Sequence, residues 1–377
     1  MAPEGQTGKS VIALGIVDAL TREVESVGVF RPIIKGGEPD EILTALLRQP
    51  AVHQEYAESF GVTYADVQAN PDDALATIVS RFGEIATHHD AVVIMGSDYR
   101  DVLGSGELAL NARIAANLNS PVAYTVSARN RSADELVSLT RNAMDELRKN
   151  HAHVVAIIPT RVPAGDEEAY ADAVRASFPD VVVGAIPDNR VLAATTVAAQ
   201  AEAVDGRLVA GRPESLAHES QTVIVGAMTL PNLLARLESE ATILLPGDRT
   251  EMIPGLLLAQ TSGSFPQLAG LILTGGYEVP DTIKSLITSV HHELPIIITD
   301  LGTYTTAEKL FGLEGTKTSS DRKTELGRRL FSEHVDADAL LSAMKVDRAE
   351  IRTPVMFEYQ LNEMARTAKR RIVLPES

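Results

Sequence analysis

The feature that most constrains the fold is a glycine-rich turn at the head of the chain. The sequence Ala2-Pro3-Glu4-Gly5-Gln6-Thr7-Gly8-Lys9-Ser10 leads directly into an apolar run over residues 11–17. In a phosphate loop, glycines let backbone N–H groups point at phosphate oxygens, a lysine supplies positive charge, and a hydroxyl reaches Mg²⁺. Gly8, Lys9 and Ser10 supply all three parts, so the turn indicates a phosphate loop at the start of a helix.

The turn departs from the usual pattern in two ways. The G-x-x-x-x-G-K-[ST] spacing requires glycine where the sequence has Pro3, and Gly5 replaces it only in part. Only Met1 and Ala2 precede the loop, so we expect its feeding strand to be missing or cut off. An ordinary helix start with Thr7 or Ser10 near the N-cap is the alternative. The pattern therefore favours descent from a phosphate loop over retained nucleotide hydrolysis. No cofactor is firmly implied, and a nucleotide with Mg²⁺ at this turn is the candidate.

Composition excludes several classes of protein. The chain has 377 residues, enough for two or three domains, and a formal net charge of −17, which disfavours nucleic acid and anionic lipid as partners. It has no cysteine, so disulfides and thiolate sites are excluded. No apolar run reaches the roughly 18 residues of a membrane span, and the polar N-terminus does not resemble a secretion signal. We therefore expect a cytoplasmic protein.

Two series of apolar runs alternate with helical patterns. The first has runs at residues 27–33, 91–96, 121–126, 154–158 and 181–187. Continuous apolar runs are typical of parallel strands covered on both faces, and the alternation predicts a doubly wound parallel α/β sheet over residues 1–190. Residues 36–80 show a helical pattern interrupted by prolines, which indicates a peripheral insertion.

The second series predicts a smaller α/β domain. A stretch rich in small residues, 191–218, is interpreted as a linker. The runs at residues 222–225, 242–245, 271–273 and 296–298 then place the second domain at residues 219–345. Residues 346–377 end in an apolar run and are interpreted as a linker and the start of another domain. We therefore expect the chain to be truncated at both ends.

Two short motifs follow strands of the second series. Gly247-Asp248-Arg249 and Thr274-Gly275-Gly276 each lie just after the carboxyl end of a predicted parallel strand, where open α/β sheets place their ligand crevice. These residues are candidates for effector binding. The alternative remains open that Asp248 caps a helix, Arg249 pairs with a local carboxylate, and the glycines serve only as turn residues.

Other polar residues give weaker signals. Asp98 follows the strand that should neighbour the phosphate loop and is a candidate Mg²⁺ ligand, although a solvated turn residue is favoured. The histidine pairs end helical segments or precede a strand and do not assemble the three or four ligands of a zinc site, so no metal site is predicted. With no G-x-S-x-G motif and no cysteine, the sequence offers no obvious nucleophile and no catalytic residue.

The order of these motifs resembles the bacterial phosphate acetyltransferases of the long, multi-domain kind. Residues 2–10, 27–33 and 111–122 look like the N-terminal segment of that family, which is similar to dethiobiotin synthetase. The Gly247 and Thr274 motifs look like its middle domain, named DRTGG after such residues. Residues 353–376 look like the start of its acetyltransferase domain.

The resemblance implies an enzyme family that interconverts acetyl-CoA and phosphate with acetyl phosphate and CoA. Its catalytic residues lie in the C-terminal domain, so none is transferred to this chain. The resemblance assigns the chain to the regulatory and assembly portion, which binds metabolite or nucleotide effectors and forms a homo-oligomer. Two alternatives remain open. One is an ATP-dependent ligase resembling dethiobiotin synthetase that uses Lys9 and Ser10, and the other is a metabolite-binding module without chemistry.

Overall fold

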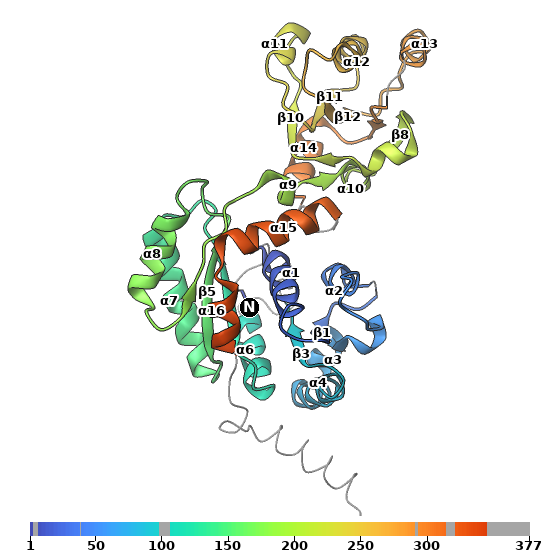
Figure 1. Cartoon of the computed structure of the whole chain (residues 1–377). Coiled ribbons are helices and arrows are strands. Elements are labelled where there is room, and N and C mark those ends of the chain that lie inside the picture. Colours follow the sequence, from blue (N-terminus) through green and yellow to red (C-terminus); the bar gives the residue numbers. More distant parts are fainter. Residues whose placement is uncertain (3–6, 38, 98–105, 291–292, 314–320, 345–377) are drawn as a thin grey trace, which may run out of the picture. The chain divides into compact units, whose positions relative to one another are not determined.

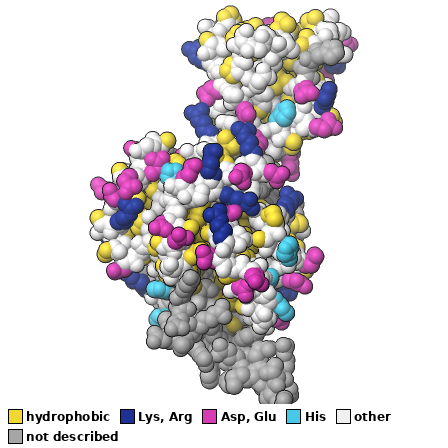
Figure 2. Space-filling view, in the orientation of Figure 1, with side chains coloured by type: hydrophobic (Ala, Val, Ile, Leu, Met, Phe, Trp, Pro, Cys, Tyr) yellow, Lys and Arg dark blue, Asp and Glu magenta, His cyan; other side chains and the backbone are white. Residues whose placement is uncertain are grey.

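The chain forms two compact units in its computed structural model (Figure 1). The structure describes residues 1–2, 7–37, 39–97, 106–290, 293–313 and 321–344. The first unit comprises residues 1–188 together with residues from 319 onward, and the second comprises residues 189–318. Asp and Glu side chains are spread over the visible face of both units (Figure 2), in keeping with the net charge of −17.

The first unit is built on parallel strands. β1 (Val27–Ile34) lies between β2 (Phe60–Thr63) and β3 (Ala91–Ile94), and β5 (Val154–Thr160) lies between β4 (Val122–Ser127) and β6 (Val182–Val183). All eight residues of β1 are buried, as its largely apolar sequence predicts. The helices are α1 (Lys9–Leu20), α2 (Glu41–Leu47), α3 (Tyr64–Ala69), α4 (Pro71–Ala86), α6 (Glu107–Asn117), α7 (Ala133–Lys149), α8 (Glu167–Ser177), α15 (Asp321–His334) and α16 (Ala337–Met344).

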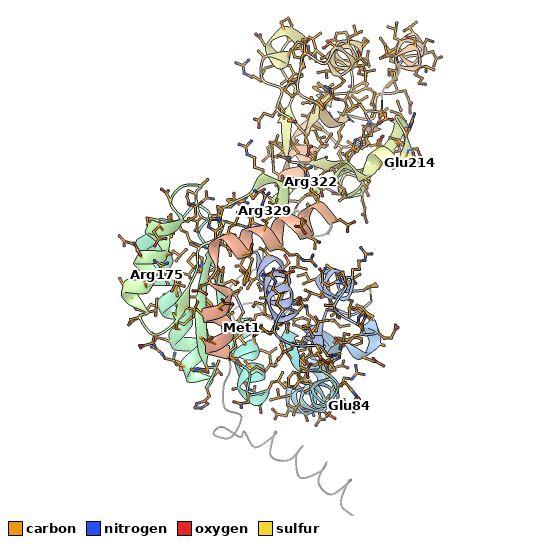
Figure 3. The ribbon with its side chains drawn as sticks, in the orientation of Figure 1. Met1, Glu84, Arg175, Glu214, Arg322 and Arg329 are labelled. Atoms are coloured by element: carbon orange, nitrogen blue, oxygen red, sulfur yellow. The ribbon has the colours of Figure 1, made fainter. Side chains whose placement is uncertain are left out.

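Met1 links the two sets of strands. Its ammonium group donates to the carbonyl of Ala123 over 2.6 Å, and its own carbonyl accepts from the backbone N–H of Thr125 over 2.7 Å. This pattern is that of a parallel strand pair with β4. The Met1 side chain also lies 3.8 Å from where a Cβ on Gly96, just after β3, would sit. Figure 3 labels Met1 within the first unit. The position of the strand expected before the phosphate loop is thus held by Met1.

The second unit is a five-stranded sheet in the order β10, β11, β12, β13, β8. The first four strands are parallel, and β8 pairs antiparallel with β13. The strands are β7 (Thr195–Thr196), β8 (Arg207–Ala210), β9 (Glu219–Ser220), β10 (Thr222–Val225), β11 (Ala241–Pro246), β12 (Leu268–Thr274) and β13 (Ile296–Ile298), and the helices are α9 (Arg190–Ala193), α10 (Val197–Ala203), α11 (Leu230–Leu234), α12 (Met252–Ser262), α13 (Asp281–Ser289) and α14 (Thr303–Phe311). Parallel sheets flanked by helices confirm the predicted α/β class in both units.

Three predicted boundaries differ from this division. Residues 36–80, interpreted as a peripheral insertion, contribute β2 to the sheet beside β1. Residues 191–218, interpreted as a linker, belong to the second unit, because β8 pairs with β13 and α10 packs into the core. Residues 321–344 fold with the first unit rather than with a second domain reaching residue 345. In each case the boundary depends on packing between segments that lie far apart in the sequence, which local hydrophobic periodicity cannot show.

α15 is held to α1 by a close side-chain fit. Phe331 of α15 is 2% exposed, and a Cβ on Gly15 of α1 would lie only 2.0 Å from its ring. Val11 packs against Gly327 in the same interface. The Arg328 guanidinium lies 4.0 Å from the Asp18 carboxylate. The helix that begins at the phosphate-loop turn therefore depends on α15 for part of its packing.

A mutant cycle at this contact tests the placement of α15. Phe331→Ala should lower the free energy of unfolding by about 3–5 kcal/mol, because it leaves a cavity against α1. Gly15→Leu should destabilise the wild-type chain by clashing with the ring, yet cost much less in the Phe331→Ala background. Urea denaturation measures the coupling, which should be roughly 1–3 kcal/mol. Additive effects would show that α15 does not pack here.

The environment of His89 predicts a pH dependence for the stability of the first unit. Its Nδ1 lies 2.7 Å from the Ser26 hydroxyl, and its ring fills the space that a Cβ on Gly28 would need. Burial, with a smaller contribution from the neighbouring His88, holds the pKa of His89 below its usual value of 6.5, and Asp90 opposes the shift. Because the folded state disfavours the charged ring, the unfolded chain binds more protons below that pH.

We expect the free energy of unfolding to fall as the pH is lowered from about 7 through about 6.5 toward the depressed folded pKa. His89→Asn should reduce that loss, whereas His88→Asn, at the exposed neighbour, should retain it. Urea titrations at a series of pH values measure both variants. An unchanged pH profile in His89→Asn would refute the assignment.

Candidate functional site

The described part of the phosphate-loop turn, residues 7–10, places a glycine in the left-handed conformation at the start of α1. Gly8 adopts a left-handed conformation, with φ of 69°, at the N-cap of α1. The first N–H groups of a helix have no partners within it, and they face outward with the positive end of the dipole. The Ser10 side chain is half-buried, and no hydrogen bond to its hydroxyl is found among the described residues. Gly5, the remaining glycine of the predicted loop, lies outside the described residues.

Hydrogen bonds from β4 and β5 hold the turn in place. The Thr7 carbonyl accepts a 2.7 Å hydrogen bond from the Thr160 hydroxyl at the end of β5. The Thr7 hydroxyl accepts from the Thr125 hydroxyl of β4 over 3.2 Å. The Thr160 side chain also lies 3.6 Å from where a Cβ on Gly8 would sit. All three threonines are buried, so they fix the turn against the carboxyl ends of β4 and β5.

Lys9 reaches the connection after β3. It is 5% exposed, and its Nζ donates to the Ser97 carbonyl over 3.3 Å and to the Gly96 carbonyl over 3.5 Å. Asn111 of α6 clamps the same connection, since its Oδ1 accepts from the Ser97 N–H over 3.0 Å and its Nδ2 donates to the Ser97 carbonyl over 3.1 Å. A Cβ on Gly96 would lie 2.7 Å from that Oδ1, so glycine is needed there. Asp98, the predicted Mg²⁺ ligand, lies outside the described residues.

A second cation, Arg31 of β1, meets the same connection. Its Nη1 donates to the Met95 carbonyl over 3.2 Å and to the Gly96 carbonyl over 2.5 Å. Its Nε is 3.1 Å from the Asp40 carboxylate, and both side chains are almost fully buried. Arg31 was not predicted as a site residue, although a charge inside an otherwise apolar strand is a signal visible in the sequence. Lys9 and Arg31 therefore place two positive side chains on the Gly96 carbonyl beside the turn.

In the second unit, the Gly247 and Thr274 motifs lie side by side. The Gly247 N–H donates to the Thr274 carbonyl over 2.8 Å, and a Cβ on Gly247 would lie 2.5 Å from that oxygen. The Thr274 hydroxyl lies 2.7 Å from the hydroxyl of Thr303, the first residue of α14. The structure thus joins the ends of β11 and β12 to the start of α14.

Arg249 and Asp248 behave differently from each other. The Arg249 guanidinium donates to the carbonyls of Ala227 and Met228 over 3.1 and 3.0 Å and pairs with Glu251. These contacts tie the end of β11 to the connection after β10, which is a structural role. Asp248 is exposed and does not cap α12, whose N-cap residue is Glu251.

The two glycines after β12 make room for neighbours that the sequence reasoning did not identify. Gly275 and Gly276 have positive φ angles of 89° and 70°. A Cβ on Gly275 would lie 2.9 Å from the Tyr277 ring, and a Cβ on Gly276 would lie 2.9 Å from the Asp300 carboxylate. Tyr277 is 55% exposed and Asp300 is also exposed. No local pattern places Asp300, which follows β13, against this turn.

Across the residues that the structure describes, no group of three or more His, Asp or Glu side chains could hold a metal ion. Within the same ranges, every helix is too short or too polar to cross a bilayer.

Two family models match the chain. An AAA domain model matches residues 1–196, and a DRTGG domain model matches residues 200–313. The first match includes the phosphate-loop turn and the sheets of the first unit. The second includes both loop motifs of the second unit.

Curated relatives match nearly the whole chain. Phosphate acetyltransferase from Synechocystis sp. strain PCC 6803 is 27% identical over 99% of this chain and 55% of the relative. The enzymes of that name from Nitratidesulfovibrio vulgaris and Escherichia coli K12 are 29% and 24% identical over 100% of this chain and 55% and 57% of the relatives. The chain therefore spans little more than half the length of these relatives.

The resemblance predicted from the order of the motifs is confirmed by these matches. Because the AAA domain model covers more than half of the chain, the chain belongs to that family, and over almost its whole length it is similar to phosphate acetyltransferases.

Proposed function

We propose that this chain is the regulatory and assembly portion of a phosphate acetyltransferase. The observation that carries the proposal is the similarity over 99–100% of this chain to relatives of which it spans about 55%. Acetyl-CoA and phosphate would then be substrates of the whole enzyme, whose catalytic groups would lie beyond the matched part. We also propose that this portion assembles as a homo-oligomer, as the resemblance implies.

An activity assay tests this assignment. The purified 377-residue chain should give no acetyl phosphate from acetyl-CoA and phosphate, because the catalytic groups of the enzyme are proposed to lie beyond the part that this chain matches. A full-length relative assayed in parallel provides the positive control. Robust turnover by this chain alone would contradict the proposal.

We further propose that the first unit binds the phosphates of a nucleotide at the turn formed by Thr7, Gly8, Lys9 and Ser10. The left-handed Gly8, the start of α1 and the Lys9 ammonium group favour an anion there. With Mg²⁺ bound to the nucleotide, the Ser10 hydroxyl and Asp98 would be the groups available to the metal. The metal would neutralise phosphate charge, while Lys9 holds the phosphates in place.

ATP binding by calorimetry tests this proposal. Lys9→Ala should weaken binding by about tenfold or more, because it removes a charge-assisted contact in a buried setting. Lys149→Ala, at an exposed lysine that pairs with Glu146 on α7, is the matched control and should leave the affinity unchanged.

The same experiment separates the alternatives. If neither ATP nor GTP binds, the nucleotide proposal fails and the ATP-dependent ligase alternative is removed with it. If ATP binds and is turned over to ADP with a carboxylic substrate, the ligase alternative is favoured over a purely regulatory role.

The second unit is proposed to bind a metabolite effector at the carboxyl ends of its parallel strands. The support is local: Gly275 and Gly276 have positive φ angles, the exposed Tyr277 ring lies against Gly275, and the exposed Asp300 carboxylate lies against Gly276. Of the predicted effector residues, Arg249 supports the loop through backbone contacts, so it is not proposed to touch the ligand.

A further inference from the structure

The first unit is completed by a segment that follows the second unit in the chain. The second unit comprises residues 189–318, and α15 and α16, which come after it, fold with residues 1–188. α15 contacts α1, and α16 contacts β5 and β6 (Figure 1). α1 begins at the phosphate-loop turn, and Thr160 of β5 bonds to Thr7 in that turn. The returning segment therefore packs on two supports of the proposed phosphate site.

One face of α1 carries the contact with α15 along the helix. Three residues of α1, spaced i, i+4 and i+7, meet α15: Val11, Gly15 and Asp18. A Val11 methyl group lies 3.6 Å from where a Cβ on Gly327 would sit. The Val11 N–H donates to the Gly8 carbonyl over 3.0 Å, so this contact lies in the first turn of α1. That turn carries the N–H groups that are proposed to meet phosphate.

The fit depends on glycines at places where a side chain would prevent docking. A Cβ on Gly15 would overlap the Phe331 ring, and a Cβ on Gly184, which follows β6, would lie 2.5 Å from the His334 carbonyl at the end of α15. Packed contacts of this kind switch between discrete arrangements rather than deform continuously. A shift of α15 would therefore either move α1 with it or separate the two helices.

α15 is held by few apolar side chains. Half of its 14 residues are charged, and the large apolar side chains that it buries are Leu330 and Phe331. An element with so few buried apolar contacts belongs to the less stable part of a fold. Its docking equilibrium is therefore open to a shift by a ligand that binds the docked state more tightly.

We propose that α15 is a strap whose docking on α1 and phosphate binding at residues 7–10 stabilise each other. Phosphate fixes the first turn of α1, and α15 packs on the same helix through Val11 and Gly15. By linkage, docking strengthens phosphate binding by the same factor as phosphate binding strengthens docking. This inference rests on the phosphate site proposed for the first unit and names its regulation, through the helix that follows the second unit in the chain.

Calorimetry on the full chain, with ATP as the probe, tests the inference. Phe331→Ala should raise the Kd for ATP about fivefold or more, because apparent binding weakens as the docked fraction of α15 falls. Ile78→Ala, which also truncates a buried side chain but lies on α4, is the matched control and should leave the Kd unchanged. An unchanged Kd in a folded Phe331→Ala variant would overturn the inference, since it is the result expected of a purely structural contact.

Hydrogen exchange in the wild-type chain keeps the test decisive if Phe331→Ala does not fold, which its melting temperature would show. ATP should slow exchange at the amides of residues 321–334 as well as at residues 7–10, and Lys9→Ala should remove both effects. Slower exchange at residues 7–10 with no change in α15 would overturn the inference and leave the phosphate site standing. If ATP does not bind the wild-type chain, the phosphate site itself fails and the inference fails with it.

Discussion

Parallel strands covered by helices on both faces can offer polar groups to a ligand only where they end, and this constraint organises both units. In the first unit, Thr7, Lys9 and the connection after β3 meet at the carboxyl ends of β3, β4 and β5. In the second, Gly276 and Asp300 meet at the ends of β12 and β13. The two edges differ in charge: the Lys9 ammonium group lies at the first, where Asp40 neutralises Arg31, whereas the exposed Asp300 carboxylate lies at the second. The positive charge at the first edge supports the phosphate site proposed there.

Most strands could be predicted because a strand buried on both faces requires a run of apolar residues, which is visible in the sequence. β1, β3, β4, β5 and β10 to β13 are continuous apolar runs, and each lies where the sequence indicates. β2 and β8 were missed because their pairing partners lie far away in the chain, inside stretches whose local pattern resembles a helical insertion and a linker. The same applies to α15, whose place against α1 depends on Phe331 entering the space left by Gly15.

The candidate sites were predictable in part, and the missing residues share a physical reason. The Gly8-Lys9-Ser10 turn and the Gly275-Gly276 pair are contiguous, so their backbone requirements are visible in the sequence. The residues that were not predicted contact the turns from other strands, helices or loops, so only the fold brings them close: Arg31, Asn111 and Asp300. Arg249 was predicted as a candidate for effector binding because it belongs to a recognisable motif. In the structure its guanidinium instead donates hydrogen bonds to neighbouring backbone carbonyls.

Hydrogen–deuterium exchange of the full chain, with and without ATP, tests most directly the claim that a nucleotide binds the first unit at its strand ends. The account predicts slower exchange at the amides of residues 7–10, with little change in peptides from the opposite ends of the same strands. Unchanged exchange at this turn, or protection confined to the opposite ends of the strands, would contradict it.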